Sequence, residues 1–166
     1  PTVQFIGDAA NISPTLSTAL AAPTSAIIAN GVATSLVTFQ IQDVNGNDVP
    51  GVDVEISSDG TGNLITQHVG GTDATGSGSG TIAATDEGLK TLTITADPLG
   101  TAVALSTQPT ILFDPDIDVA LSTAVALPAT DVVADGVTTA DIVVTVLDSQ
   151  GAPQPGQAVE LSLIHI

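Results

Sequence analysis

The stretch IIANGVATSLVTFQIQDVNGNDVPG (residues 27–51) decides the fold, because it occurs a second time as VVADGVTTADIVVTVLDSQGAPQPG (residues 132–156). The similarity extends over residues 12–57 and 117–162, with 18 identities in 46 positions at a constant offset of 105 and no gap. Similarity at one fixed spacing is typical of tandem structural repeats. We therefore expect one structural unit that is built twice.

The matched segments divide the chain into three parts. TVQF at residues 2–5 resembles TILF at residues 110–113, which lies just before the second copy. We therefore expect residues 1–10 to be the tail of a preceding repeat and residues 12–116 to be one complete repeat. Residues 117–166 are then the N-terminal half of a second repeat. On this interpretation the chain begins inside a longer protein, as a first residue that is not methionine also indicates.

The last six residues, LSLIHI (residues 161–166), depart from the repeat after Ser162. Mainly apolar residues then stand where the first copy has the polar turn SDGT, a place where a solvated loop is expected. We interpret these residues as an artefact, because the start of an adapter used in transposase-made sequencing libraries translates as Leu-Ser-Leu-Ile-His-Ile. The alternative is a natural strand with unusual residues. Under either interpretation we assign no function to His165.

Apolar and polar residues alternate along the quoted stretch with a period of two, which places the apolar ones on one face of a strand. Asn45-Gly46 predicts a tight hairpin after it, since both residues tolerate positive φ. Similar short runs between Gly-rich turns, without a helical period, predict an all-β fold of two antiparallel sheets packed face to face. The residues expected to face the interior are Val37, Phe39, Ile41, Val54, Ile56, Leu92 and Ile94.

The second copy keeps the apolar face of the first, but the strands that should cover this face are missing from residues 117–166. Half a sandwich exposes apolar surface and unpaired strand edges. We therefore expect the chain to fray or aggregate beyond Asp118. Four residues should be more exposed than their counterparts in the first copy: Ile142, Val144, Val146 and Val159.

Three segments resemble a known family. ANGVATSLVTFQIQDVNGNDVPGVDVEIS (29–57) and ADGVTTADIVVTVLDSQGAPQPGQAVELS (134–162) resemble the opening of a bacterial immunoglobulin-like domain of group 1, the invasin/intimin type. TDATGSGSGTIAATDEGLKTLTITA (72–96) is similar to the second-half signature of that family, a Thr-Asp-x-x-Gly turn followed by two strands. The resemblance covers essentially the whole chain. It implies tandem immunoglobulin-like antiparallel β-sandwiches that lack the Cys…Trp…Cys pattern of antibody domains.

The chain departs from the family pattern at three positions. Asn30 replaces the usual Asp, and Gly78 and Gly80 stand in a strand where Ala or Val is usual. Glycine weakens a strand because it offers no side chain to pack. We interpret GSGSG (76–80) as a flexible turn that runs into a poorly packed strand.

The charge of the chain is strongly negative, with 18 acidic residues against Lys90 alone and a net charge of −17. Such a surface repels phosphate backbones, which excludes nucleic acid as a partner. No apolar run is long enough to span a bilayer, so we expect no direct membrane insertion of this segment. Cations are the natural small partners, although plain solvation or adaptation to salt explains the same composition.

One acidic cluster has the residue types of a metal site. FDPDID (113–118) places Asp114, Asp116 and Asp118 at alternating positions on the junction between the repeats. Clustered carboxylates suit Ca²⁺, which takes six to eight oxygen ligands, and a bound ion would stiffen the joint. The alternative is a solvated acidic linker, because the preceding junction FIGDAAN keeps only Asp8.

The sequence favours no enzyme. It has no Cys and no Tyr, so a nucleophilic site would need Ser or Thr with His68 as its base. His68 lies at an alternating position beside a Gly turn, which is typical of an exposed histidine at a strand end. The GSGSG segment lacks the Lys and the following helix of a phosphate loop. We therefore expect no catalytic residues and no cofactor other than calcium.

The resemblance implies extracellular display and cell adhesion, with binding concentrated in a head domain outside this segment. We expect a structural stalk repeat of a bacterial cell-surface or secreted adhesin, with neighbouring repeats as partners and a receptor bound elsewhere. The absence of Trp, Tyr and Arg fits a spacer, because binding hot spots favour these residues. Two alternatives stay open: a ligand- or glycan-binding module, and an accessory domain of a secreted polysaccharide-degrading enzyme.

Overall fold

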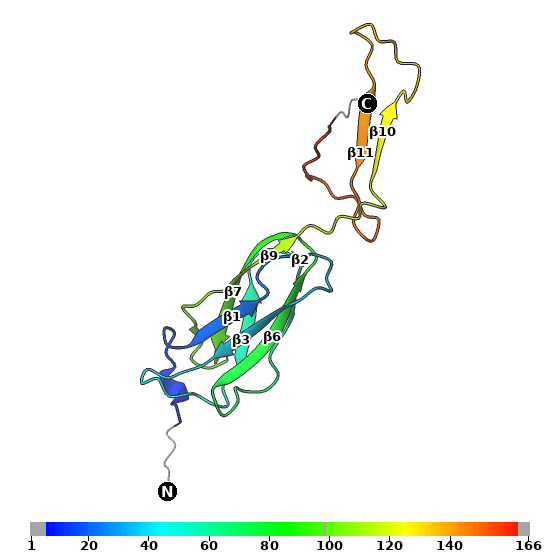
Figure 1. Ribbon diagram of the computed structural model, residues 1–166. Helices are drawn as coiled ribbons and strands as arrows, with labels where there is room; N and C mark the ends of the chain where they lie inside the picture. The colour runs from blue at the N-terminus through cyan, green and yellow to red at the C-terminus, as the bar shows by residue number, and fades with distance from the viewer. Residues whose placement is uncertain (1–5, 98, 163–166) are drawn as a thin grey trace. The chain divides into compact units, whose positions relative to one another are not determined.

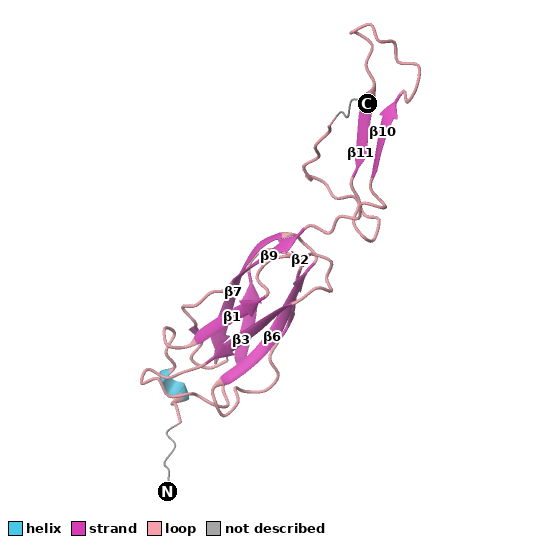
Figure 2. Ribbon diagram, in the orientation of Figure 1, coloured by secondary structure: helices cyan, strands magenta, loops and turns pink. Residues whose placement is uncertain are grey.

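The chain divides into two compact units, residues 1–115 and 116–166. The computed structural model describes residues 6–97 and 99–162. Both units consist of β-strands and loops, and the helical content of the described residues is the single 3₁₀ turn η1 (Ala9–Asn11) (Figures 1 and 2). The prediction of an all-β fold is confirmed.

The first unit contains two sheets, one with the strand order β1-β3-β6-β5 and one with the order β2-β9-β7-β4, in which β8 also pairs with β7. All pairs are antiparallel except β2 with β9. The strands are β1 (Thr18–Ala22), β2 (Ile27–Ile28), β3 (Ser35–Gln40), β4 (Val54–Ser58), β5 (Asn63–Thr66), β6 (Ser77–Ala84), β7 (Gly88–Ala96), β8 (Val103–Ala104) and β9 (Thr110–Asp114).

The core of the first unit lies between the two sheets. The period-two pattern explains it, because alternate residues of β3 and β7 are buried and the residues between them are more exposed. All seven residues predicted to face the interior are buried, from Ile41 at 0% exposure to Val54 at 7%. This prediction is confirmed. Ile82 from β6 and Ile111 and Phe113 from β9 also belong to this core.

The turn after β3 carries the chain from one sheet to the other. Gln42 and Asp48 form an isolated antiparallel bridge around the predicted Asn45-Gly46 turn, and Gly46 has a φ of +80°. The hairpin at Asn45-Gly46 does not continue into a longer ladder, because the next strand, β4, pairs with β7 of the opposite sheet and not with β3. Residues 41–53 therefore connect the two layers.

The interpretation of GSGSG as a flexible turn before a poorly packed strand is wrong beyond Gly76. Residues 77–84 form β6, an interior strand that pairs with both β3 and β5. A Cβ atom on Gly78 would lie 2.6 Å from two ring carbons of Phe39, and one on Gly80 would lie 2.5 Å from the carbonyl oxygen of Thr66. Both glycines are therefore explained by the close packing of their neighbours.

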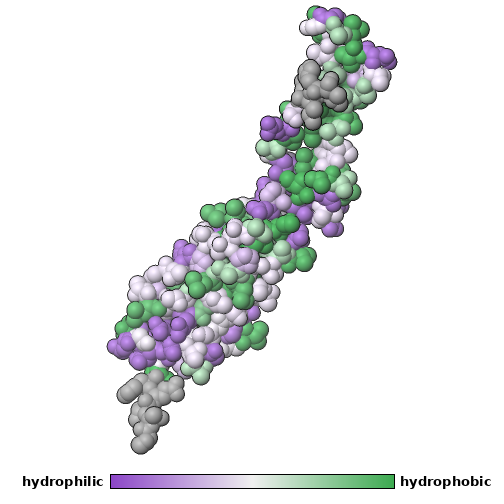
Figure 3. Space-filling view, viewed as in Figure 1, coloured by the Kyte–Doolittle hydropathy of each residue, from purple (hydrophilic) through white to green (hydrophobic). Residues whose placement is uncertain are grey.

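The second unit contains one described sheet, formed by β10 (Thr123–Leu127) and β11 (Asp141–Thr145). Its register reproduces that of β1 and β3 at the offset of 105: Thr18 faces Gln40, and Thr123 faces Thr145. Ile142 is 48% exposed, Val159 is 50% exposed, and Val144 and Val146 are half-buried, whereas their counterparts in the first unit are buried. The predicted exposure is confirmed, and Figure 3 shows hydrophobic residues on the surface of this unit.

Candidate functional site

Each repeat contains an aspartate that organises the turn after its β3-type strand. The Asp43 carboxylate accepts hydrogen bonds from the backbone N–H groups of Asn45 (2.8 Å) and Asn47 (2.9 Å). In the second unit Asp148 accepts from the N–H groups of Gln150 (2.9 Å) and Ala152 (2.7 Å). The pKa of Asp43 is lowered by Asn47, and that of Asp148 by the N–H of Ala152 first, because these donors favour the charged form.

A second matched pair caps the loop before the β3-type strand. Asn30 Oδ1 accepts from the N–H groups of Val32 and Ala33, both at 2.9 Å. Its counterpart Asp135 accepts from the N–H of Val137 at 2.9 Å and from that of Thr138 at 2.6 Å. The amide oxygen of Asn30 thus makes the same contacts as the carboxylate, which explains why this departure from the family pattern is tolerated.

This pair gives a pH prediction. The N–H of Thr138, followed by that of Val137, lowers the pKa of Asp135 from 3.8 to about 2. Because the folded-state pKa is depressed, the stabilisation of the loop is fully present above pH 3.8 and is lost as the pH falls through about 2. Carboxyl ¹³C chemical shifts should give a midpoint near 2 for Asp135, and the Asn30 loop should show no such transition. A midpoint near 3.8 would contradict the capping role.

The three aspartates of the predicted calcium site have different local roles. Asp114 is the last residue of β9 and is half-buried. Asp116 accepts a hydrogen bond from Ser149 Oγ at 2.7 Å. Asp118 Oδ1 accepts from the N–H groups of Ala120 (2.7 Å) and Leu121 (3.1 Å). Asp118 thereby caps the first turn of its repeat.

The first repeat uses Ser13 for the role of Asp118, because Ser13 Oγ accepts from the N–H of Leu16 at 3.2 Å. In the described residues, no group of three or more His, Cys, Asp or Glu side chains is placed to hold a metal ion. Calcium binding by Asp114, Asp116 and Asp118 stays a prediction.

Calorimetry of the full chain at low ionic strength tests this prediction. If the three carboxylates share Ca²⁺, the titration should show saturable binding that Asp116→Asn weakens, while Mg²⁺, which keeps its waters, binds much less. Asp131→Asn, the same change of charge at an exposed aspartate outside the cluster, is the control. Equal weak heats for the parent chain and both variants would show that the junction is a solvated linker.

The interpretation of His68 as an exposed residue at a strand end is wrong. The side chain is half-buried, with its ring edge-on to Phe39 at a centroid distance of 5.5 Å. Nδ1 lies 3.3 Å from the backbone N of Ser79, which donates to it, and Nε2 lies 3.4 Å from the carbonyl oxygen of Gly71. His68 therefore ties the segment after β5 to β6. The sequence does not predict this role of His68, because only the folding of the sheet brings His68 close to its hydrogen-bond partners.

Lys90 is a second side chain whose place the sequence did not predict. It is buried in β7, with 4% of its surface exposed, and its Nζ donates to the carbonyl oxygen of Thr61 at 2.8 Å. Its positive charge contributes to lowering the pKa of Asp86, after the larger effects of the Thr61 and Thr85 hydroxyls. The one cationic side chain of the protein thus fixes the loop before β5.

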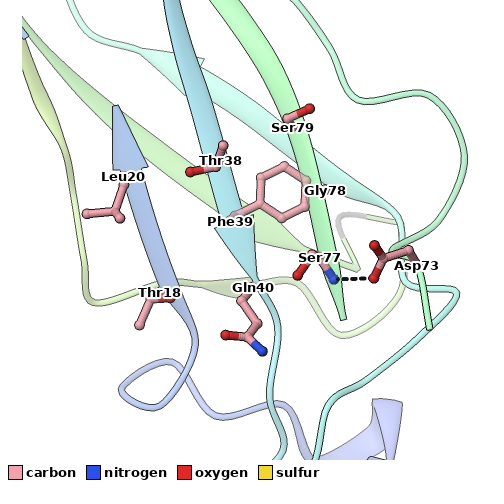
Figure 4. A pocket seen from close by; sticks show the side chains of 9 residues that line it. All are labelled: Thr18, Leu20, Thr38, Phe39, Gln40, Asp73, Ser77, Gly78 and Ser79. Atoms are coloured by element: carbon pink, nitrogen blue, oxygen red, sulfur yellow. Dashed lines mark hydrogen bonds between the residues drawn. The ribbon is translucent and has the colours of Figure 1, made fainter. Parts of the chain in front are cut away.

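A shallow groove of about 460 Å³ lies on the outer face of the sheet that contains β1, β3 and β6 (Figure 4). Its lining is rich in hydroxyl groups, and Asp73 is its one charged member, held by the N–H of Ser77 at 3.0 Å. The Phe39 ring lies below Gly78 and is 3% exposed. The groove therefore offers hydrogen-bonding groups and Leu20, without an exposed aromatic face.

Together the two-sheet architecture and the repeated turns define the class of this protein: a tandem β-sandwich protein of the immunoglobulin-like type. A family model described as the bacterial Ig-like domain (group 1) matches residues 17–110, more than half of the 166 residues. The chain belongs to this family. The predicted family and fold are confirmed.

Solved structures of bacterial adhesins are similar to the chain. Invasin, a bacterial integrin-binding protein, is 26% identical with a TM-score of 0.68 over 89% of this chain and 29% of that chain. The Yersinia pseudotuberculosis adhesin InvE is 33% identical with a TM-score of 0.56 over 70% of this chain and 30% of that chain. The Escherichia coli adhesin FdeC is 21% identical with a TM-score of 0.62 over 91% and 46%, which shows a shared fold.

The chain spans less than a third of the invasin and InvE chains that it matches. No curated protein sequence matches it significantly. The activities of those whole adhesins therefore bear on this chain only as a proposal.

Proposed function

We propose that the chain is a spacer segment in the stalk of a bacterial adhesin, displayed on the cell surface or secreted. The observation that carries this proposal is the repeat itself: the strand pair β1–β3 recurs as β10–β11 in identical register, in a family shared with adhesins. In a chain of tandem sandwiches, each added domain increases the length of the stalk. A strand rises about 3.3 Å per residue, so a sandwich with strands of about ten residues adds roughly 30–40 Å.

Membership in this domain family supports a role without catalysis. The described residues agree with such a role through their local bonding. His68 and Lys90, the side chains that a catalytic site would most readily use, are engaged in holding loops to the sandwich. The Asp43 and Asp148 carboxylates are engaged in turns that both repeats share.

The described surface gives less support to a glycan-binding module. Sugar recognition usually uses exposed aromatic rings, and both phenylalanines among the described residues, Phe39 and Phe113, are buried. A solved fragment of intimin forms a complex with the intimin-binding domain of the translocated intimin receptor. We propose that receptor binding by the parent protein likewise belongs to another domain, with the present segment acting as its spacer.

The proposed location outside the cell follows from the adhesin relatives. None of the helical segments in residues 6–97 and 99–162 has the length and apolar character that spanning a bilayer requires. We propose that anchoring also belongs to another part of the parent protein.

A display experiment tests the proposed function. Residues 12–116 are inserted in one, two and four copies between an outer-membrane anchor and a binding head of known affinity. We expect binding to receptors on a second surface to extend to larger separations with each copy, while the affinity of the head for soluble receptor stays constant. The purified chain alone should not bind host cells. Strong binding by the chain alone, or reach that is independent of copy number, would overturn the stalk proposal.

A further inference from the structure

Strand β1 is an edge of its sheet, and its outer side is open. Among the described strands it pairs with β3 only. In an antiparallel pair, alternate residues direct their N–H and C=O groups away from the neighbouring strand. A groove of about 420 Å³ runs along this side, between residues 19–21 of β1 and the segment 107–110. The outward backbone groups of β1 therefore face a groove.

The edge at β4 is closed by a side chain. The backbone N–H of Ile56 donates to Gln67 Oε1 at 2.8 Å, and Gln67 Nε2 donates to the carbonyl oxygen of Ile56 at 2.6 Å. The Gln67 amide thus takes the place of a peptide group from a neighbouring strand. Proteins protect sheet edges by covering them, or with charges and prolines, because an open edge pairs with other chains. β1, with the sequence TALAA, contains neither a charge nor a proline.

The negative charge of the chain limits the surfaces through which two copies can associate. Each copy carries a net charge of −17, so most contacts between copies bring like charges together. The groove beside β1 is lined by uncharged residues only, and two leucines stand at it: Leu20 is 69% exposed and Leu89 is 63% exposed. A contact along β1 therefore buries apolar surface without placing carboxylates opposite one another.

We propose that β1 pairs with β1 of a second copy of the chain, antiparallel about a two-fold axis that passes beside Leu20. The strand is nearly symmetric about this residue, because Ala19 and Ala21 flank it and Thr18 comes to face Ala22 of the second copy. Leu20 then meets its own symmetry mate in a cross-strand apolar pair. Because both copies use the same patch, the contact closes as a dimer and does not propagate.

The geometry of the sheet agrees with this pairing. Thr18 and Leu20 lie on β1 beside Thr38 and Gln40 on β3 in Figure 4, and all four of these side chains are uncharged. Ala19 and Ala21 point inward, and their small size lets a second strand approach closely. The two four-stranded sheets thereby join edge to edge into one, and the added strand lies over the groove and covers Leu89.

Disulfide trapping of the full chain tests the proposal, since the protein contains no native cysteine. A two-fold contact through position 20 places the new thiols of Leu20→Cys opposite each other. Leu64→Cys, at a leucine of 50% exposure on β5 at the other edge of the same sheet, is the matched control. Under mild oxidation, we expect the Leu20→Cys dimer to form at least about tenfold faster, because pairing raises the effective thiol concentration. Equal rates for the two variants would overturn the proposal.

Sedimentation of cysteine-free chains gives an independent readout. Dimerisation should strengthen between low salt and about 1 M NaCl, where charges are screened beyond about 3 Å. Leu20→Lys places a charge in the centre of the contact and should lower the association constant at least about tenfold, whereas Leu64→Lys leaves it unchanged. Far-UV circular dichroism confirms folding of both variants. An unchanged association constant for Leu20→Lys would show that any self-association uses another surface, such as the apolar face of β10 and β11.

Discussion

Replacing Phe39 with alanine should lower the free energy of unfolding of the first unit by about 3–5 kcal/mol. The ring is 3% exposed, lies edge-on to His68, and occupies space that Gly78 leaves free. Its removal leaves a cavity that the two sheets cannot easily close, because the backbones on both sides are held by ladder hydrogen bonds. Urea unfolding followed by far-UV circular dichroism measures this change, since the chain has no Trp or Tyr for fluorescence.

Leu89→Ala is the control for this measurement. Leu89 belongs to β7 but is 63% exposed in the single chain, so at concentrations where the chain is monomeric its truncation should change the free energy of unfolding by no more than about 0.5 kcal/mol. If Phe39→Ala costs no more than Leu89→Ala, the ring is not part of a tightly packed core and the position of β6 against β3 is wrong.

Limited proteolysis of the chain should cut the second unit at least about tenfold faster than the first, because local opening of a poorly covered strand pair costs little free energy. β10 and β11 pair only with each other among the described strands, and the face that corresponds to the first core is exposed. Thermolysin is suited to this test because it cuts before aliphatic residues, which both units contain. Mass spectrometry then assigns each cut to a bond.

Equivalent bonds in the two repeats supply the internal control. The bond before Ile142 in β11 corresponds to the bond before Val37 in β3, at the same place in the repeat. We expect rapid cleavage at the first and protection at the second. Equal resistance of the two bonds would mean that the second unit acquires a cover, and would contradict the exposure described for Ile142.

The strand pattern could be predicted from the sequence because it depends on local alternation. Val37, Phe39 and Ile41 are separated by polar residues, and this period of two is typical of a half-buried strand. The internal repeat predicted that residues 117–162 build the same strands as residues 12–57, and equivalent residues do pair alike in both units. These features require only information from neighbouring residues and from one fixed offset.

The features that the sequence does not predict depend on partners that are distant in the chain. Gly78 and Gly80 indicate a weak strand by local pattern, although their small size is required by Phe39 and by the Thr66 carbonyl on the adjacent strands. His68 bonds to Ser79 across a sheet pairing that no local pattern reveals. The capping role of Asp118 can be predicted in part from the repeat. Asp118 aligns with Ser13 in the first copy, and serine is a residue type that caps turns.

The burial of Lys90 has a consequence for digestion. Trypsin-like proteases cut after Lys or Arg, and this chain offers them one bond, Lys90–Thr91. That bond lies within β7, where Lys90 is paired with Ile111 of β9 and its side chain is enclosed. A protease must bind its substrate as a free extended segment, so the folded sandwich presents no cleavable site, and cutting requires that β7 first leave the sheet. A domain of this composition would withstand trypsin-rich surroundings although it contains no cysteine to form a disulfide.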